Sequence, residues 1–249
     1  MPWLLIRRVC VLLLALCPAL PLQGEVKIAV LGGDQMQAYE VPTLLQSMLL
    51  HRGLQGRVLQ AIAPGATLDD HIRGLKGLQS MRMVAEEKPT FVVVQEAAEA
   101  ALGDTEGMVF VAGKMSTALR QAGSEPVFVV PFPPLGNDRN RLKLIDAYQE
   151  LESQANVAVA PVAQAWQIAA QHNPSLKLYA DRGEPSAAGA YLTACVLYSC
   201  LTGTSPEGLP RTFQTKQDDG SVATILSLSE NDALFCQRVA IRALSEVGR

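Results

Sequence analysis

Basic residues are neither abundant nor clustered in this chain of 249 residues. Lysine and arginine together number 21, against 24 aspartates and glutamates, and no stretch is rich in either basic residue. A nucleic-acid-binding protein needs a basic patch to neutralise phosphates, so nucleic acid is excluded as a partner. Glycine (19) and proline (15) are present at ordinary levels. This composition excludes collagen-like and low-complexity chains.

No run of apolar residues is long enough to span a membrane. Near the start, Arg7 and Arg8 precede the apolar run 9–16. This run is shorter than the ~20 residues of a membrane-spanning helix, and a basic start followed by a short apolar run is typical of a secretory signal peptide. We therefore expect a leader over residues 1–24, export to the periplasm or the extracellular space, and a mature chain, 25–249, that forms a single domain.

Cysteine is scarce once this leader is removed, because only Cys195, Cys200 and Cys236 remain. Three cysteines are too few, and odd in number, for a disulfide framework. Their apolar helical surroundings predict buried free thiols, with a bridge from Cys236 as the alternative in an oxidising compartment. Within the leader, a lipid anchor on Cys17 is the alternative to simple cleavage, although Leu16 stands where lipoprotein signals carry a small residue.

What the chain does contain is an alternation of short β-branched runs with helical patterns. This alternation predicts a parallel sheet with helices on both faces, a three-layer α/β/α sandwich. The expected strands are 26–31, 57–62, 91–95, 127–130 and 157–160. The expected helices are 41–52, 68–86, 107–122, 140–155, 161–172, 186–202 and 230–247. A hairpin is expected around residues 218–220.

Motifs for common cofactors are missing. The glycines before Lys114 are one residue too far apart for a phosphate-binding loop, and they fall within a predicted helix. Residues 203–207 begin like a nucleophile elbow but end in a glutamate and follow no strand. The sequence also lacks a dinucleotide fingerprint, a paired Cys-x-x-Cys and a His-Glu-x-x-His motif. We therefore expect no cofactor and no resident metal.

Four segments follow one another in the order expected for the loops of such a sheet. They are 29–34 (Ala-Val-Leu-Gly-Gly-Asp), 63–71 (Ala-Pro-Gly-Ala-Thr-Leu-Asp-Asp-His), 92–96 (Val-Val-Val-Gln-Glu) and 178–186 (Leu-Tyr-Ala-Asp-Arg-Gly-Glu-Pro-Ser). Together they resemble the SGNH (GDSL-like) hydrolases, in particular the branch whose first strand runs into a Gly-Asn-Ser turn and whose last motif reads Asp-x-x-His-Pro-Ser. The resemblance covers about residues 27–209 and implies the flavodoxin-like fold of that superfamily.

The resemblance also implies where a catalytic triad would lie. In that superfamily a serine attacks an acyl ester, a histidine takes its proton, and an aspartate three residues before the histidine orients it. Asp34 stands at the serine position, Asp181 at the aspartate position and Glu184 at the histidine position. A glutamate, whose reference pKa is about 4.3, is a poor base at neutral pH. Because the serine is replaced as well, we expect serine-esterase activity to be absent.

Hydrogen-bond donors for a developing oxyanion are a second implication of the resemblance. They correspond to the backbone N–H of Asp34, to Gly65 and to Gln95, where this branch has glutamine in place of the usual asparagine. His71 lies in the first turn of the helix predicted after the Gly65 loop. It is therefore a candidate binding residue, with a plain polar surface or packing role as the alternative.

Three functions are compatible with these residues. The first is a protein that has lost catalysis and binds a small molecule, a glycan, an acyl group or a protein in the former substrate groove. The second is an active hydrolase of carbohydrate esters or glycosides, in which Asp34, Asp181 and Glu184 are crowded carboxyls with separated pKa values. The third is a divalent-cation site built from the same acids. Sequence spacing does not give the carboxyl distances that separate these hypotheses.

Overall fold

The computed structural model describes residues 26–133, 138–181, 183–217 and 219–248. The expected leader therefore lies outside the described residues. Within them, five strands form one parallel sheet in the order β2-β1-β3-β4-β5. Their bounds are β1 Val26–Gly32, β2 Gly56–Ile62, β3 Phe91–Val94, β4 Glu125–Val129 and β5 Ala158–Ala160. The five predicted strands are confirmed, and the order is that of a flavodoxin-like sheet.

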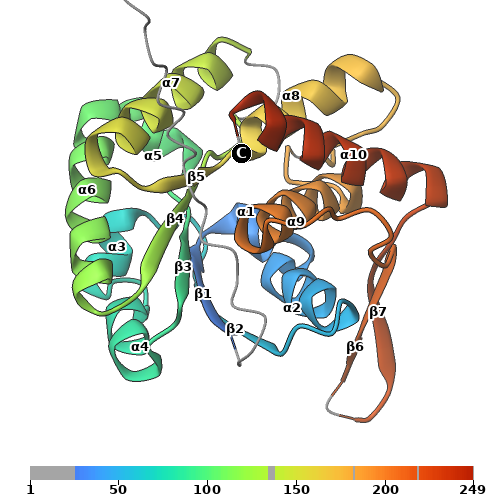
Figure 1. The fold of residues 1–249 in the computed structure, drawn as a ribbon, viewed down its shortest axis with the longest axis horizontal. Helices are drawn as coiled ribbons and strands as arrows, with labels where there is room; N and C mark the ends of the chain where they lie inside the picture. The colour runs from blue at the N-terminus through green and yellow to red at the C-terminus, as the bar shows by residue number, and fades with distance from the viewer. Residues whose placement is uncertain (1–25, 134–137, 182, 218, 249) are drawn as a thin grey trace, which may run out of the picture.

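Helices cover both faces of this sheet, so the predicted three-layer α/β/α architecture is confirmed (Figure 1). One face packs against α2 Val41–His51, α8 Val162–His172, α9 Ala187–Thr202 and α10 Glu230–Glu246. The other packs against α3 Leu68–Arg73, α4 Ser80–Glu87, α5 Ala98–Gly103, α6 Thr105–Gln121 and α7 Asp138–Ala155.

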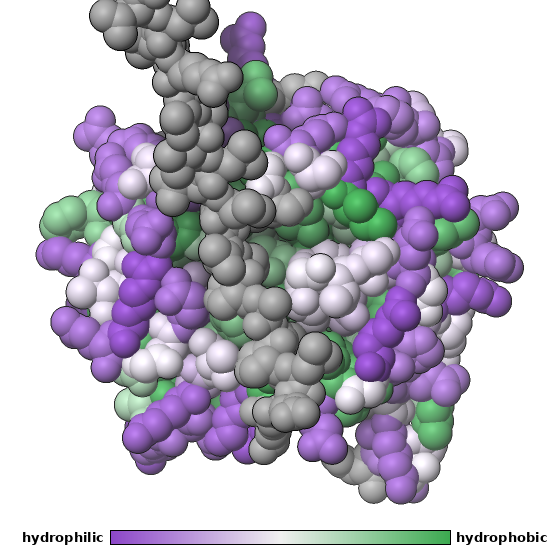
Figure 2. Space-filling model, in the orientation of Figure 1, coloured by the Kyte–Doolittle hydropathy of each residue, from purple (hydrophilic) through white to green (hydrophobic). Residues whose placement is uncertain are grey.

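Strand β3 illustrates why the sheet lies in the middle layer. All four of its residues are buried. Because neighbouring side chains on a strand point to opposite faces, Phe91 and Val93 join one hydrophobic cluster while Val92 and Val94 join the other. A strand buried on both faces needs an unbroken apolar run, and the sequence supplies one. On the face shown in Figure 2, hydrophilic side chains make up most of the rim, which is where the outer surfaces of the helices lie.

The single helix predicted over 68–86 is wrong, because the structure divides this segment into α3 and α4. Gly74 ends α3 in the left-handed conformation, with φ of 68°, and Gly77 is also left-handed, with φ of 74°. Glycine adopts this conformation without the clash of a Cβ atom, so two glycines so close together favour a turn over a continuous helix. The start was predicted correctly, since the hydroxyl of Thr67 accepts a hydrogen bond from the N–H of Asp70.

Two short elements after β1 were not predicted. They are α1 Asp34–Gln37 and the 3₁₀ turn η1 Ala38–Glu40. The expected hairpin is present as the antiparallel pair β6 Thr212–Lys216 and β7 Val222–Ser227. No helix in the described part of the chain is long and apolar enough to cross a lipid bilayer. Cys195, Cys200 and Cys236 are buried free thiols, as predicted.

Candidate functional site

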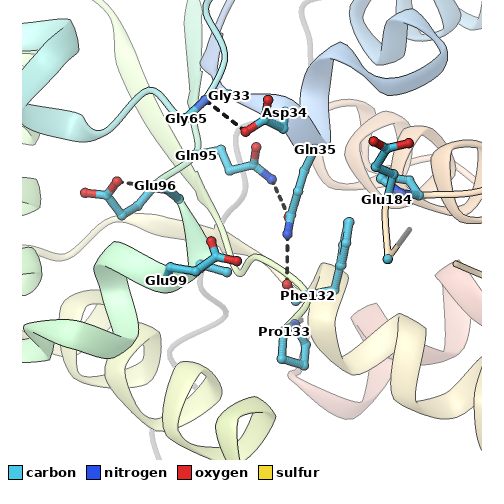
Figure 3. A pocket seen from close by; sticks show the side chains of 14 residues that line it. Gly33, Asp34, Gln35, Gly65, Gln95, Glu96, Glu99, Phe132, Pro133 and Glu184 are labelled. Atoms are coloured by element: carbon cyan, nitrogen blue, oxygen red, sulfur yellow. Dashed lines mark hydrogen bonds between the residues drawn. The ribbon is translucent and has the colours of Figure 1, made fainter. Parts of the chain in front are cut away.

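A cavity of about 300 Å³ lies at the carboxyl ends of β1, β3 and β4 (Figure 3). Strand β1 has β2 on one side and β3 on the other, so the loops after these strands leave in different directions and open a crevice. The lining residues are Gly33, Asp34, Gln35, Gly65, Gln95, Glu96, Ala97, Ala98, Glu99, Phe132, Pro133, Gly183, Glu184 and Pro185. The structure thus brings together four sequence-predicted site residues, namely Asp34, Gly65, Gln95 and Glu184.

Asp34 is held at the cavity wall by the loop after β2. The backbone N–H of Gly65 donates a hydrogen bond of 2.8 Å to Oδ2 of Asp34. Gly65 itself has a φ of 58°, a left-handed conformation that favours glycine. The ammonium of Lys76 donates to the carbonyl of Gly65, so both backbone polar groups of this residue have partners. The Gly65 loop is therefore fixed with its N–H group on the Asp34 carboxylate.

Gln95 is buried at the end of β3 and belongs to a chain of amides. Its Nε2 donates to Oε1 of Gln35 at 2.9 Å, and Nε2 of Gln35 donates to the carbonyl of Phe132 at 2.8 Å (Figure 3). The Phe132 ring stacks on Trp166 with 3.7 Å between ring centroids, which holds the loop after β4. Sequence reasoning missed Gln35, whose one signal was its place next to Asp34.

Glu96 is the most strongly perturbed carboxyl group of the cavity. Its side chain accepts hydrogen bonds from the backbone N–H groups of Ala97 at 2.7 Å and Leu68 at 3.2 Å. Burial raises its pKa to about 7, which outweighs the two hydrogen bonds that favour the charged form. Glu96 therefore ties the start of α3 to the end of β3 and titrates near neutral pH. The signal for it was a carboxylate two residues after the end of an unbroken apolar strand.

Glu184 comes from the loop before α9. The carbonyl of Glu184 accepts a hydrogen bond of 2.8 Å from the N–H of Ala180, and Gly183 is left-handed with φ of 82°. This tight turn presents Glu184 to the cavity, while Asp181 is exposed and is not among the described residues that line it. The structure therefore does not bring Asp181 into the cavity with Asp34 and Glu184.

His71 also lies away from the lining. It is fully buried in α3, with Nδ1 2.7 Å from the hydroxyl oxygen of Ser80. Burial lowers its pKa to about 4, so the imidazole is neutral at physiological pH. These contacts are those of a packed structural histidine, which is the alternative role that the sequence left open for it.

No described group of three or more histidine, cysteine, aspartate or glutamate side chains has an arrangement that could hold a metal ion. The cation-site hypothesis gains no geometric support from the described residues.

Comparison with solved structures identifies the fold. A scan against protein-family models finds no match, and a search of curated protein sequences finds none either. Among solved structures, a protein from Slackia heliotrinireducens assigned to the SGNH hydrolases aligns with a TM-score of 0.63 and 23% identity, over 72% of this chain and 100% of its own. The chain has the SGNH-hydrolase fold.

Two further structures extend this comparison. A DUF4886 family protein from Bacteroides uniformis aligns with a TM-score of 0.72 and 13% identity, over 91% of this chain and 97% of its own. A protein from Parabacteroides merdae assigned to the GDSL-like lipases aligns with a TM-score of 0.61 and 14% identity, over 75% of this chain and 99% of its own. At these identities the SGNH-hydrolase fold is shared, and function has to be argued from the site.

On this SGNH-hydrolase fold, two of the three oxyanion donors that the resemblance implies are already engaged. The N–H of Gly65 is bound to Asp34, and Nε2 of Gln95 is bound to Gln35. The third donor, the backbone N–H of Asp34, has no hydrogen-bond partner among the described residues. An oxyanion at this place would therefore meet one free donor and the carboxylate of Asp34.

Proposed function

We propose that this protein is exported and binds a small organic ligand in the cavity at the ends of β1, β3 and β4, without hydrolysing acyl esters. The observation that carries the proposal is the hydrogen bond between Oδ2 of Asp34 and the N–H of Gly65. The side chain at the nucleophile position carries a negative charge, and it occupies a donor that ester hydrolysis needs for the developing oxyanion.

The shape of the site supports ligand binding as well. A cavity of about 300 Å³ is at the lower end of the range for small-molecule sites, and it lies where ligands bind in open parallel sheets. Its wall combines the buried ring of Phe132 with the polar side chains of Gln35 and Gln95. A few fixed polar groups on an apolar wall are what orients a small ligand.

A fluorophosphonate probe and p-nitrophenyl acetate test the catalytic half of this proposal. We expect no covalent labelling, because fluorophosphonates trap an activated serine. We also expect the rate of p-nitrophenyl acetate hydrolysis to be no higher than that of the variant Asp34→Ala. An active SGNH esterase run in parallel is the positive control. Stoichiometric labelling of the unaltered protein would overturn the proposal.

Thermal unfolding with a ligand panel tests the binding half. The panel contains monosaccharides and short oligosaccharides, short-chain fatty acids and dipeptides, each at millimolar concentration. We expect at least one class to raise the unfolding temperature, since a ligand that binds only the folded state stabilises it. The same ligand should lose its effect when Gln95→Leu alters the cavity wall. Absence of any stabilisation across the panel would contradict the proposal.

A second candidate function is hydrolysis by paired carboxylates. It is favoured by one observation, which is that Asp34 and Glu184 line the same cavity as Glu96, whose pKa is raised to about 7. An acid that stays protonated near neutral pH, next to an ionised carboxylate, is the arrangement that glycoside hydrolysis requires. Release of p-nitrophenol from a panel of p-nitrophenyl glycosides, abolished by Glu96→Gln, would favour this candidate over ligand binding alone.

A further inference from the structure

The charged side chains among the described residues that line the cavity all have the same sign. Asp34, Glu96, Glu99 and Glu184 line it, and no lysine, arginine or histidine is among its described lining residues. A site for an ester oxyanion, a carboxylate or a phosphate requires the opposite sign or a surplus of donors. The described lining therefore favours a cationic group over an anion.

The amide chain decides the polarity of the buried wall. The carbonyl oxygen of Phe132 accepts hydrogen bonds and donates none, so the group that Gln35 turns toward it is Nε2. Oε1 of Gln35 therefore faces Gln95 and accepts a hydrogen bond from Nε2 of Gln95. The orientation of both side-chain amides therefore follows from the Phe132 carbonyl. It places Oε1 of Gln95 on the side away from Gln35.

That oxygen is the buried acceptor of the site. Gln95 is 2% exposed and lines the cavity, and no described residue donates a hydrogen bond to its Oε1. In Figure 3 the oxygen points toward the turn of Gly33 and Asp34, away from Gln35. Because Nε2 of the same amide is already bound to Gln35, Oε1 is the atom of Gln95 that can accept a hydrogen bond from a donor in the cavity.

A neighbouring hollow extends the same wall. It has a volume of about 370 Å³, shares Asp34, Glu184 and Pro185 with the first cavity, and adds Tyr39 from η1. Tyr39 is left-handed, with φ of 50° and ψ of 27°, and its side chain is 39% exposed. The face of an exposed tyrosine ring attracts cations.

We propose that the cavity binds its ligand through a primary ammonium group. This inference rests on the proposed ligand-binding function and names the chemistry of the ligand. An ammonium has three N–H donors and no acceptor, and it complements a wall made of the Asp34 and Glu184 carboxylates and Oε1 of Gln95. The positive charge distinguishes it from a neutral sugar hydroxyl, which gains less from a carboxylate. Amino sugars and simple alkylamines both carry this group.

Calorimetric titration with matched pairs of probes tests this chemistry and separates the two sources. Glucosamine is compared with N-acetylglucosamine, n-butylamine with n-butanol, and glucuronate is the anionic probe, all at pH 6, where the amines are protonated. We expect each amine to bind at least tenfold more tightly than its neutral partner, and glucuronate to bind least. Selectivity in the glucosamine pair alone assigns the site to amino sugars, and selectivity in both pairs assigns it to the ammonium group itself.

Two variants identify the groups responsible. Asp34→Asn keeps an oxygen for the Gly65 N–H but removes the charge, and we expect it to weaken amine binding at least tenfold. Gln35→Leu releases the amide of Gln95 to turn its Nε2 toward the cavity, and we expect it to reduce the preference for amine over neutral partner. Glu86→Gln, an exposed change of the same charge on α4, is the control and should leave binding unchanged.

The outcomes separate this inference from the function on which it rests. Equal or tighter binding of N-acetylglucosamine or glucuronate, lost in Gln95→Leu, would overturn the ammonium proposal and leave the ligand-binding function in place. Absence of binding by every probe here, together with fluorophosphonate labelling, would overturn both.

Discussion

The N–H of Gly65 donates to Oδ2 of Asp34, and this bond joins the loops that follow β1 and β2. The donor and the acceptor are 31 residues apart in the sequence, and their contact closes one edge of the cavity. A serine hydroxyl is shorter and uncharged, so it would leave the same N–H free for substrate. An aspartate at position 34 therefore holds a backbone donor that a serine at the same position would leave free.

Placing serine at position 34 and histidine at position 184, as in the triad that the resemblance implies, should produce weak esterase activity. In the double variant Asp34→Ser with Glu184→His, we expect slow p-nitrophenyl acetate hydrolysis, while each single variant stays at background. Adding Gln35→Leu should raise kcat/KM by a further ~10²-fold, because it frees Nε2 of Gln95 and one oxyanion donor contributes a factor of ~10²–10³. Gln35→Leu alone is the control and should be inactive. A triple variant no faster than the double would show that Gln95 does not serve this role.

Glu96 should make the folded state less stable as pH rises. Its pKa is about 7 in the folded protein against 4.5 as the ordinary value, so between these values the folded state holds a proton that the unfolded chain has lost. Stability is therefore highest below pH 4.5 and falls by about 3 kcal/mol by pH 7 from this group alone. Urea unfolding of Glu96→Gln at several pH values checks this, since the variant should lose that decline.

His71 should act in the opposite direction over part of the same range. Its pKa falls from 6.5 to about 4 on folding, so between these values the unfolded chain binds a proton that the folded state does not. Stability from this group rises with pH, by about 3 kcal/mol between pH 4 and 6.5. The two effects oppose each other from pH 4.5 to 6.5. Unfolding of His71→Asn should lose the rise and leave the Glu96 decline visible, and an unchanged pH profile would contradict the assignment.

Gly189, near the start of α9, should not tolerate a methyl group. A Cβ atom there would lie 2.4 Å from the carbonyl oxygen of Leu178 and 2.6 Å from the Trp166 ring. We expect Gly189→Ala to destabilise the protein by about 1–3 kcal/mol, because the segment that carries Glu184 must move away from α9. Gly113→Ala is the matched control in α6, where nothing lies within 4 Å of the added atom, and it should stabilise by about 0.5–1 kcal/mol. Thermal or urea unfolding measures both.

Processing of the leader predicts the start of the mature chain. We expect N-terminal sequencing of the protein recovered from its native cell to begin near residue 25, in the exported fraction. Replacing Arg7 and Arg8 by glutamate should hold the precursor inside the cell, because the basic start of a signal peptide is required for its orientation. Recovery of a cytoplasmic chain that retains Met1 would contradict the prediction.

The sheet was predictable from its strands, and the resemblance of four loop segments to the SGNH hydrolases then assigned four residues to one site. Unbroken apolar runs identify buried parallel strands, and the carboxyl ends of such strands meet at one edge. Asp34, Gly65 and Gln95 follow successive strands, so their meeting needs no knowledge of side-chain contacts. Glu184 was expected there because residues 178–186 resemble the last motif of the SGNH hydrolases. The helix predicted after it, at 186–202, runs from 187 to 202 in the structure.

The remaining features depend on contacts that a local pattern does not contain. The partner of Gln35, the carbonyl of Phe132, is 97 residues away, and its position depends on how the loop after β4 returns over the sheet. The raised pKa of Glu96 depends on its burial beneath the start of α3. Asp181 is three residues from Glu184, yet the left-handed turn at Gly183 lies between them, and only Glu184 lines the cavity.

Helix α9 is covered in part by a helix that the ribosome synthesises after it. Every residue of it after Ala187 is buried, and α10 supplies part of that cover through Gln237, whose amide donates to the Tyr191 hydroxyl at 2.6 Å. A nascent chain that has not yet added residues 230–246 leaves this apolar helix open to water on one side. Truncated products that lack α10 are therefore expected to aggregate or be degraded. The apolar surface of α9 is fully covered once α10 has been synthesised and has packed against it.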